Sequence, residues 1–275
     1  MLSIVEDVDR YRFIEPGAFQ AGELEVTSED IIANLPFREG CGMWFDHHIT
    51  NKPDVDFKGA WYVAPSAARV IYDYYSDKDL TAFDELVKIT DRIDSADLTM
   101  KEVKEPKGYI LASMTIDGKR LQDEQYWLKL IELIRQNSIE KLLEDVEVEE
   151  RCLAYMYDCQ EYGQAISLYS EVEDNVLVTD LRKVWHGEPG NRFLAYTLFP
   201  QCNIWVRAMD HPNRKDLSHI SVGHSIFNQT CNVNVGELMA KYGGGGHKGA
   251  GSCRPLRTES EQALKEIVEF CKDKK

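Results

Sequence analysis

The sequence predicts an α/β fold with two domains, and three observations lead to this prediction. A short apolar run, Met43 to Phe45, ends directly in ligand-type residues, which is typical of a buried strand whose carboxyl end opens onto a site. Apolar residues recur at three- and four-residue steps after Ser66 and again after Ala82, which indicates helices. From Asn175 the apolar period becomes strand-like, which indicates a second domain.

The length of 275 residues is sufficient for two modest domains, each with its own core. We expect an N-terminal domain with a parallel sheet over 1–120 and a smaller C-terminal domain with a mixed sheet over 171–275. The segment between them, 121–170, is expected to be a mostly helical connector, because Trp127 and Leu130 begin an apolar stripe with helical spacing.

Local patterns predict the elements of each domain. In the first domain we expect strands over Ile31–Leu35 and Met43–Phe45, a helix capped by Ser66, and a helix from about Ala82 to Ile89. In the second domain we expect four strands, a short helix and a closing amphipathic helix. The strands are Val176–Val178, Phe193–Tyr196, Asn203–Met209 and Ile220–Val222, and the helices are Val235–Lys241 and Glu261–Cys271.

Composition excludes several classes of protein. The net charge of -15 argues against a long, non-specific nucleic-acid surface, although a short oligonucleotide or mononucleotide stays compatible with it. No apolar run reaches the roughly 20 residues that a bilayer-spanning helix needs, and the first residues do not form a signal peptide. The seven cysteines contain no C-x-x-C pair, so we expect a cytoplasmic protein with free thiols.

Asp46, His47 and His48 follow the buried run directly and form the first candidate site. Imidazole nitrogens and carboxylate oxygens are the ligands that hold Mn²⁺, Fe²⁺, Co²⁺ or Zn²⁺ in proteins. Adjacent histidines on an extended chain point to opposite sides, so they rarely serve one metal equally. We expect one imidazole to bind a metal and the other to face the substrate or to be held by a carboxylate. Taken alone, the pair is equally compatible with loop histidines that bind nothing.

The second candidate site is the glycine-rich stretch from Gly243 to Gly251, which contains His247 and Lys248. Glycines permit positive φ angles and leave backbone N–H groups uncovered, so such a stretch can hold an anion. The alternative is a flexible linker, but linkers of this kind are usually Gly/Ser-rich and lack a central His-Lys pair. We therefore expect this stretch to be a loop that binds a phosphate or another anion.

The two motifs together are specific, whereas each one alone is weak. Asp46-His47-His48, followed roughly 200 residues later by Gly-Gly-Gly-Gly-His-Lys-Gly-Ala-Gly, resembles the DHH phosphoesterase superfamily with its DHH-associated C-terminal domain. The resemblance extends from about Asp30 to Ser252. Relatives in this superfamily include RecJ-type exonucleases, NrnA-type oligoribonuclease/pAp phosphatases and exopolyphosphatase-related proteins.

The resemblance implies a role for each motif. His47 would bind one of two metal ions, most often Mn²⁺ with Mg²⁺ or Co²⁺ as alternatives, and Asp91 would bind the same ion, with Asp94 as the alternative ligand. His48 would face the phosphate, and Asp46 would support the pair. The rest of the substrate would lie, across a cleft between the domains, against Gly244, Gly245, Gly246, His247 and Lys248.

The chain departs from the superfamily pattern in three places. The first motif, an Asp-x-Asp beside a histidine, is not found, so we expect the N-terminal sheet to lack its first strand, through a late start of the polypeptide or as a degenerate relative. At the second motif, Asn34 stands where a bridging aspartate is expected, and Asp30 lies just upstream. Relatives carry an arginine-serine pair where this chain has Gly223-His224-Ser225.

The sequence therefore supports two functions. The first is a metal-dependent phosphoesterase, a hydrolase of a small phosphorylated substrate such as a short oligonucleotide, a nucleoside bisphosphate, a cyclic dinucleotide or polyphosphate. The second is a non-catalytic nucleotide- or phosphate-binding protein, which the missing first motif and Asn34 favour. No membrane partner is expected, and a homodimer is left open.

Overall fold

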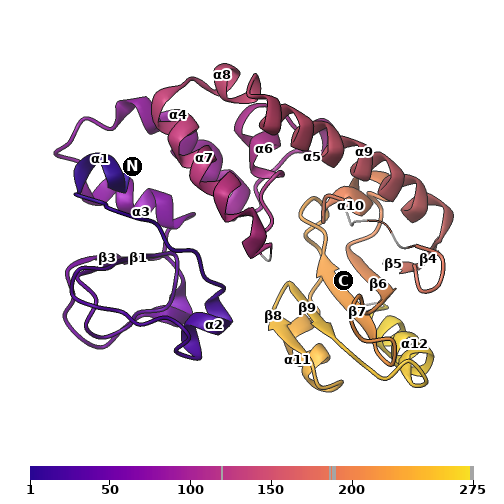
Figure 1. Ribbon diagram of the computed structural model, residues 1–275. Helices are drawn as coiled ribbons and strands as arrows, with labels where there is room; N and C mark the ends of the chain where they lie inside the picture. Colours follow the sequence, from indigo (N-terminus) through magenta and orange to yellow (C-terminus); the bar gives the residue numbers. More distant parts are fainter. Residues whose placement is uncertain (119, 186, 188–189, 273–275) are drawn as a thin grey trace. The chain divides into compact units, whose positions relative to one another are not determined.

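The computed structural model describes residues 1–118, 120–185, 187 and 190–272. The chain divides into two compact units, Met1–Leu98 with Lys107–Cys152, and Thr99–Pro106 with Leu153–Lys275. The division falls inside helix α9, Val146–Leu168, and thus within the expected connector at 121–170 (Figure 1).

The N-terminal unit is built on a three-stranded parallel sheet in the order β1-β2-β3 (Figure 1). The strands are β1, Ile31–Ala33, β2, Met43–Asp46, and β3, Gly59–Trp61. All four residues of the central strand β2 are buried, as expected for an apolar run in a parallel sheet. Because the strands are parallel, the carboxyl ends of β1 and β2 meet at one edge. Within 1–118, which is fully described, no strand precedes Ile31.

The two expected helices of this unit are present. Helix α3, Ala67–Tyr74, packs on β2 and begins where the Ser66 hydroxyl accepts a 3.1 Å hydrogen bond from the Arg69 amide. Helix α4, Asp84–Asp94, follows a short 3₁₀ turn, η2, Thr81–Phe83. The aspartates of the expected metal motif, Asp91 and Asp94, lie in the last turn of α4. The other helical segments are α1, Leu2–Val5, α2, Pro16–Gln20, η1, Ile49–Asn51, η2, Thr81–Phe83, α6, Gly108–Ser113, η3, Leu121–Asp123, α7, Glu124–Gln136, and α8, Ile139–Leu143.

The C-terminal unit contains a mixed six-stranded sheet in the order β4-β5-β6-β7-β9-β8 (Figure 1). Only β5 and β6 pair in parallel, and the other neighbours are antiparallel. The strands are β4, Ser170–Glu173, β5, Val176–Asp180, β6, Ile204–Asp210, β7, Ser218–His224, β8, Gly245–His247, and β9, Ala250–Cys253. The helices are α5, Met100–Lys104, α9, α10, Leu194–Leu198, α11, Val235–Ala240, and α12, Ser260–Cys271. The α/β architecture predicted from the sequence is confirmed.

Two local predictions for this unit were wrong. Phe193–Tyr196 was expected to be a strand, but helix α10 begins at Leu194. Asn191 starts the helix, because its side-chain oxygen accepts a hydrogen bond from the Phe193 amide and its carbonyl oxygen accepts one from the Leu194 amide. The residues of its first turn are all buried, and a fully buried apolar run has no periodicity that separates helix from strand. The glycine-rich stretch was expected to be a loop, but it forms the β8–β9 hairpin.

The composition predicted free cysteine thiols and no helix that spans a membrane. All seven cysteines are free thiols in the structure. Among the described residues, no helix combines the length and the apolar character that crossing a membrane requires.

Candidate functional site

Asp46 is a fully buried carboxylate at the carboxyl end of β2. Its Oδ1 atom accepts hydrogen bonds from the His47 backbone amide and from His48 Nδ1, both at 2.8 Å. Its Oδ2 atom accepts a 2.7 Å hydrogen bond from the side-chain amide of Asn51. Because its oxygens are engaged in this way, Asp46 fixes the turn after β2 and orients His48.

The Nε2 nitrogen of His47 faces a carboxylate. The Nδ1 nitrogen lies 2.9 Å from the carbonyl oxygen of Ala64, which can only accept, so Nδ1 donates there and Nε2 is the nitrogen that remains for another partner. Nε2 is buried without a hydrogen-bond partner, and Asp94 Oδ2 lies 3.3 Å from it. A proton or a divalent cation between Nε2 and this carboxylate oxygen would bridge the two atoms.

His48 is the more exposed of the two imidazoles. Its ring contacts the His47 ring edge-on, with centroids 4.2 Å apart. Since Asp46 accepts the hydrogen of Nδ1, the Nε2 atom of His48 is the nitrogen left for a ligand, and 48% of the side chain is exposed. The two adjacent histidines therefore have different partners, a carbonyl oxygen for His47 and a carboxylate for His48.

Asp91 and Asp94 lie in the same helix turn but have different partners. Both oxygens of Asp91 are engaged, since Oδ1 accepts from the Ser66 hydroxyl at 2.6 Å and Oδ2 accepts from the Arg69 guanidinium at 2.7 Å. Asp94, the alternative ligand from the sequence, is the aspartate that faces His47. The role of Asp91 as a metal ligand stays a prediction, and the geometry favours Asp94.

Asn34 occupies the position next to Asp46 on the neighbouring strand. It directly follows β1, in which Ala33 pairs with Phe45, and its backbone is left-handed with φ 58°. Asp30 lies at the opposite end of β1, where Arg12 and Thr27 bond its carboxylate. A residue with a neutral amide therefore follows β1 at the position next to Asp46, where the superfamily resemblance implies a bridging carboxylate.

These residues fit a divalent cation. Asp46, His47 and His48 offer ligand atoms that all lie within 4.8 Å of one another. Asp46 is already occupied by hydrogen bonds, whereas His47 Nε2 has no hydrogen-bond partner and faces the Asp94 carboxylate, so these two groups are the ones placed to share a cation. An imidazole whose other nitrogen donates to a backbone carbonyl is the usual form of a metal-bound histidine.

The β8–β9 hairpin holds the glycine-rich stretch in a defined shape. The His224 amide donates to the Gly249 carbonyl at 2.8 Å, and the Val235 amide donates to the Lys248 carbonyl at 3.0 Å. Burial, aided by the charge of Lys248, lowers the pKa of His224, which therefore stays neutral near pH 7. His247 and Lys248 are exposed at the tip, and Gly244, Gly245 and Gly246 lie before them in the hairpin. What this hairpin binds stays a prediction.

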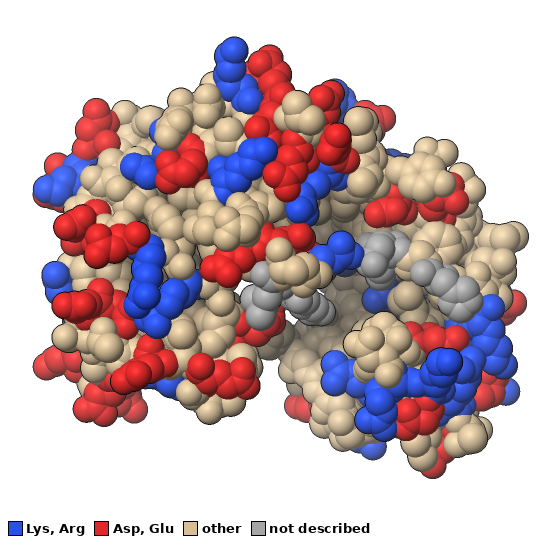
Figure 2. All heavy atoms as spheres, in the orientation of Figure 1, with Lys and Arg blue, Asp and Glu red and all other residues tan. Residues whose placement is uncertain are grey.

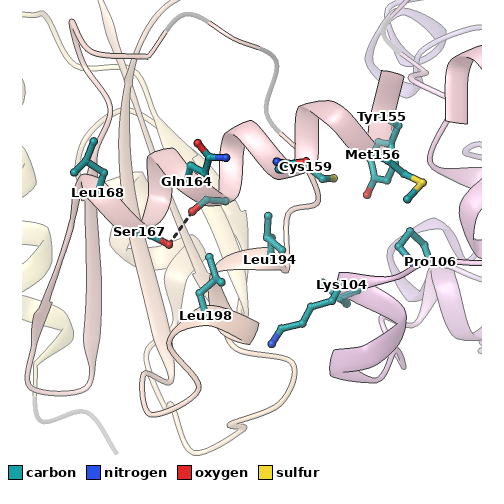
Figure 3. A pocket seen from close by; sticks show the side chains of 13 residues that line it. Lys104, Pro106, Tyr155, Met156, Cys159, Gln164, Ser167, Leu168, Leu194 and Leu198 are labelled. Atoms are coloured by element: carbon teal, nitrogen blue, oxygen red, sulfur yellow. Dashed lines mark hydrogen bonds between the residues drawn. The ribbon is translucent and has the colours of Figure 1, made fainter. Parts of the chain in front are cut away.

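A separate hollow of about 690 Å³ lies between α5, α9 and α10 of the same unit (Figure 3). Its walls are mostly apolar, with Met156 and Leu168 on α9 and Leu198 on α10, and Lys104 extends from α5 toward α10. None of the sequence-predicted site residues lines it. One ammonium group among apolar walls does not make a phosphate site, so we assign no ligand to this hollow.

Comparison with known proteins decides the family. No family model and no curated protein matches the chain. A solved structure, the pGpG-specific phosphodiesterase PggH from Vibrio cholerae, is 31% identical and superposes with a TM-score of 0.87, covering 98% of this chain and 92% of that chain. The chain belongs to the DHH phosphoesterase family.

Two other solved structures are much less similar to this DHH protein. The C-Ala domain of Aquifex aeolicus alanyl-tRNA synthetase is 19% identical, with a TM-score of 0.28 over 37% of this chain and 96% of that chain. The DHH domain of a member of a ribosomal-protein family is 15% identical, with a TM-score of 0.37 over 84% of this chain and 64% of that chain. Scores this low carry no weight for function.

The sequence did not reveal several groups that shape the site of this DHH protein. Asn51 was not singled out, although its position three residues after His48 is within reach of Asp46. Arg69 was also missed, and nothing in its sequence context indicates that it pairs with Asp91. The backbone carbonyl that fixes the His47 tautomer carries no sequence signal, since every residue has one.

Proposed function

We propose that this chain is a metal-dependent phosphodiesterase that hydrolyses short, 5′-phosphorylated oligonucleotides, and that the dinucleotide pGpG is its first candidate substrate. The solved structure that supports this choice is that of a pGpG-specific phosphodiesterase, and it covers 98% of this chain. The observation that carries the catalytic part is the buried, unpartnered Nε2 of His47, which faces Asp94 at 3.3 Å.

His47 Nε2 and Asp94 would hold the divalent cation. When bound, such a cation supplies a water of lowered pKa and neutralises charge on the phosphoryl oxygens. The Ala64 carbonyl keeps the His47 ring in the ligand tautomer, and the buried position of the ring limits competition from bulk water. Mn²⁺ as the metal, a cytoplasmic location and a homodimer remain predictions from the sequence.

His48 would contact the scissile phosphate through Nε2. Asp46 accepts the Nδ1 hydrogen, so the ring is held in one orientation and Nε2 is the nitrogen available to the substrate. Hydrolysis adds one water across the P–O3′ bond, and the leaving 3′ oxygen needs a proton. His48 is suited to donate that proton, or a hydrogen bond to a phosphoryl oxygen, because its Nε2 is not used within the protein.

A second function has one observation in its favour. Asn34 replaces a carboxylate beside Asp46, and Arg69 neutralises Asp91, so fewer anionic ligands face the histidines than a two-metal site requires. A protein with such a site could bind a nucleotide without cleaving it. The phosphodiesterase is favoured because the same unit also contains His47 Nε2, which has no hydrogen-bond partner, facing the Asp94 carboxylate.

The test is hydrolysis of pGpG by the full chain with Mn²⁺, measured as release of 5′-GMP. We expect turnover in the wild type, its loss with a chelator, and a decrease of at least about 100-fold in His47→Ala. His211→Ala is a matched control, since His211 lies just after β6 in the other unit and should leave the rate unchanged. Equal rates for wild type and His47→Ala would remove the catalytic proposal, and binding of pGpG without cleavage would favour the second function.

A further inference from the structure

Arg207 is a partly buried cation on β6 that lacks an anionic partner. Among the described residues no carboxylate lies within ion-pair distance of it, whereas neighbouring arginines such as Arg182 and Arg257 pair with Asp180 and Asp210. A partly desolvated guanidinium without a counter-charge is costly, so a ligand that supplies negative charge would stabilise it.

Neutral groups hold the Arg207 side chain in place. Its Nη1 donates to the hydroxyl of Tyr162, its Nε donates to the Ser221 hydroxyl at 3.2 Å, and its guanidinium lies 5.2 Å from the centre of the Trp205 ring. Burial raises the pKa of the Tyr162 phenol, so this partner stays uncharged at neutral pH. Two of the five N–H groups of the guanidinium are used in these bonds, which leaves three for an external acceptor.

Strand register places Arg207 on the same sheet face as the glycine-rich hairpin. Arg207 pairs with Ser221, Ser221 pairs with Ser252, and Ser252 pairs with Gly245, so one row crosses β6, β7, β9 and β8 (Figure 1). Directly paired residues point to the same face of a sheet, and so do residues two apart along a strand. His247, two residues after Gly245, therefore shares this face with Arg207.

The same face is open toward β9 and β8 because its residues are small. Ser221, Ser252 and Gly223 are only partly buried, and Gly245 and His247 are exposed. The Tyr196 hydroxyl donates to the Gly223 carbonyl at 2.7 Å, and a Cβ atom at Gly223 would lie 3.0 Å from that hydroxyl. A larger residue at Gly223 would therefore displace Tyr196.

We propose that Arg207 binds a phosphate group of the nucleotide substrate on this face, with the hydroxyls of Ser221 and Ser252 as further donors. The proposal rests on the proposed function and names the cation by which the C-terminal unit recognises that substrate. A planar guanidinium matches two oxygens of one phosphate, and hydroxyl donors complete the remaining oxygens. The β8–β9 hairpin with His247 borders the same surface and limits it to a small ligand.

The test compares wild type, Arg207→Gln, Arg207→Lys and Ser221→Ala as full chains. Calorimetry measures affinity for 5′-GMP and for guanosine, and steady-state kinetics measure pGpG hydrolysis. We expect Arg207→Gln to weaken 5′-GMP binding by about 10- to 100-fold and to raise KM for pGpG by a similar factor, with affinity for guanosine unchanged. Arg207→Lys should recover part of the loss, and Ser221→Ala should show a smaller loss.

Arg214→Gln is the matched control, because Arg214 is exposed and already paired with Asp216. Equal 5′-GMP affinities for wild type and a folded Arg207→Gln variant, with equal melting temperatures, would overturn the assignment. A wild type that binds 5′-GMP through Arg207 but does not cleave pGpG would uphold Arg207 and contradict the proposed activity. Cleavage of pGpG by the wild type, together with an unchanged KM in Arg207→Gln, would uphold the proposed activity and contradict the role of Arg207.

Discussion

At the scale of single residues, the site depends on which hydrogen-bond partner each histidine has. His47 and His48 are adjacent and chemically identical, yet a carbonyl oxygen holds one ring and a buried carboxylate holds the other. The sequence predicted that the two imidazoles would have different roles, because neighbouring side chains on an extended chain point apart. It could not choose between Asp91 and Asp94, since both end the same helix and only its packing decides which one faces His47.

The two aspartates give a prediction at this scale. We expect Asp94→Asn to weaken Mn²⁺ binding by about 10- to 100-fold, because it removes the negative charge that faces His47 Nε2. We expect Asp91→Asn to leave Mn²⁺ affinity nearly unchanged and to lower the free energy of unfolding by about 1–3 kcal/mol, because Arg69 loses the closer of its two carboxylate partners and keeps only Asp73. Calorimetric Mn²⁺ titration and urea unfolding measure the two effects.

Each variant is the control for the other in this experiment. If Asp91→Asn lost the metal and Asp94→Asn kept it, the ligand role implied by the family resemblance would be correct and the choice of Asp94 would be wrong.

At the scale of elements, the glycine-rich stretch is a strand pair and not a mobile linker. Helix α11 packs directly against the hairpin, and a Cβ atom at Gly236 would meet the Gly246 carbonyl at 2.7 Å. The sequence predicted that glycines were needed here, but it could not predict the pairing. Strand formation by such residues depends on the neighbouring strand β7 and on this helix, since glycine has little intrinsic preference for strands.

Gly245 and Gly246 give a matched pair of substitutions. Gly246 has a φ of 156°, and a Cβ there would overlap the Ala250 carbonyl, so we expect Gly246→Ala to cost about 1–3 kcal/mol of unfolding free energy and to weaken substrate binding. No atom lies within 4 Å of a Cβ at Gly245, so Gly245→Ala should change stability by less than about 1 kcal/mol. Thermal or urea unfolding checks both, and equal effects would contradict the close packing of the hairpin.

At the scale of the whole molecule, charge is distributed unevenly between the two units. Nearly all of the net charge of -15 belongs to the N-terminal unit, because acidic and basic residues almost balance in the C-terminal unit. Figure 2 shows acidic side chains widely spread over the visible face of the N-terminal unit, while Lys and Arg gather around α11 and α12 of the C-terminal unit. A long polyanion would meet repulsion along the acidic unit, whereas a short substrate needs only local positive groups.

This distribution predicts a preference for short substrates. With equal concentrations of ends, we expect hydrolysis of pGpG to exceed hydrolysis of a single strand of roughly 20 nucleotides by on the order of tenfold or more, because each added phosphate adds repulsion. The preference should decrease as salt rises, since ions screen exposed charges. Rates that do not depend on length at low salt would contradict the electrostatic explanation.

The sequence by itself determined the architecture, the histidine pair and the glycine-rich motif, because hydrophobic periodicity and the chemistry of rare residue types are local properties of the chain. The tertiary structure decided which groups meet. In the folded chain, Asp94 faces His47 and Asp91 pairs with Arg69. Helix α10 begins within the segment expected to be a strand, and Arg207 forms hydrogen bonds with neutral groups. These outcomes depend on contacts between residues far apart in the chain, and neither composition nor spacing encodes the direction in which a packed side chain points.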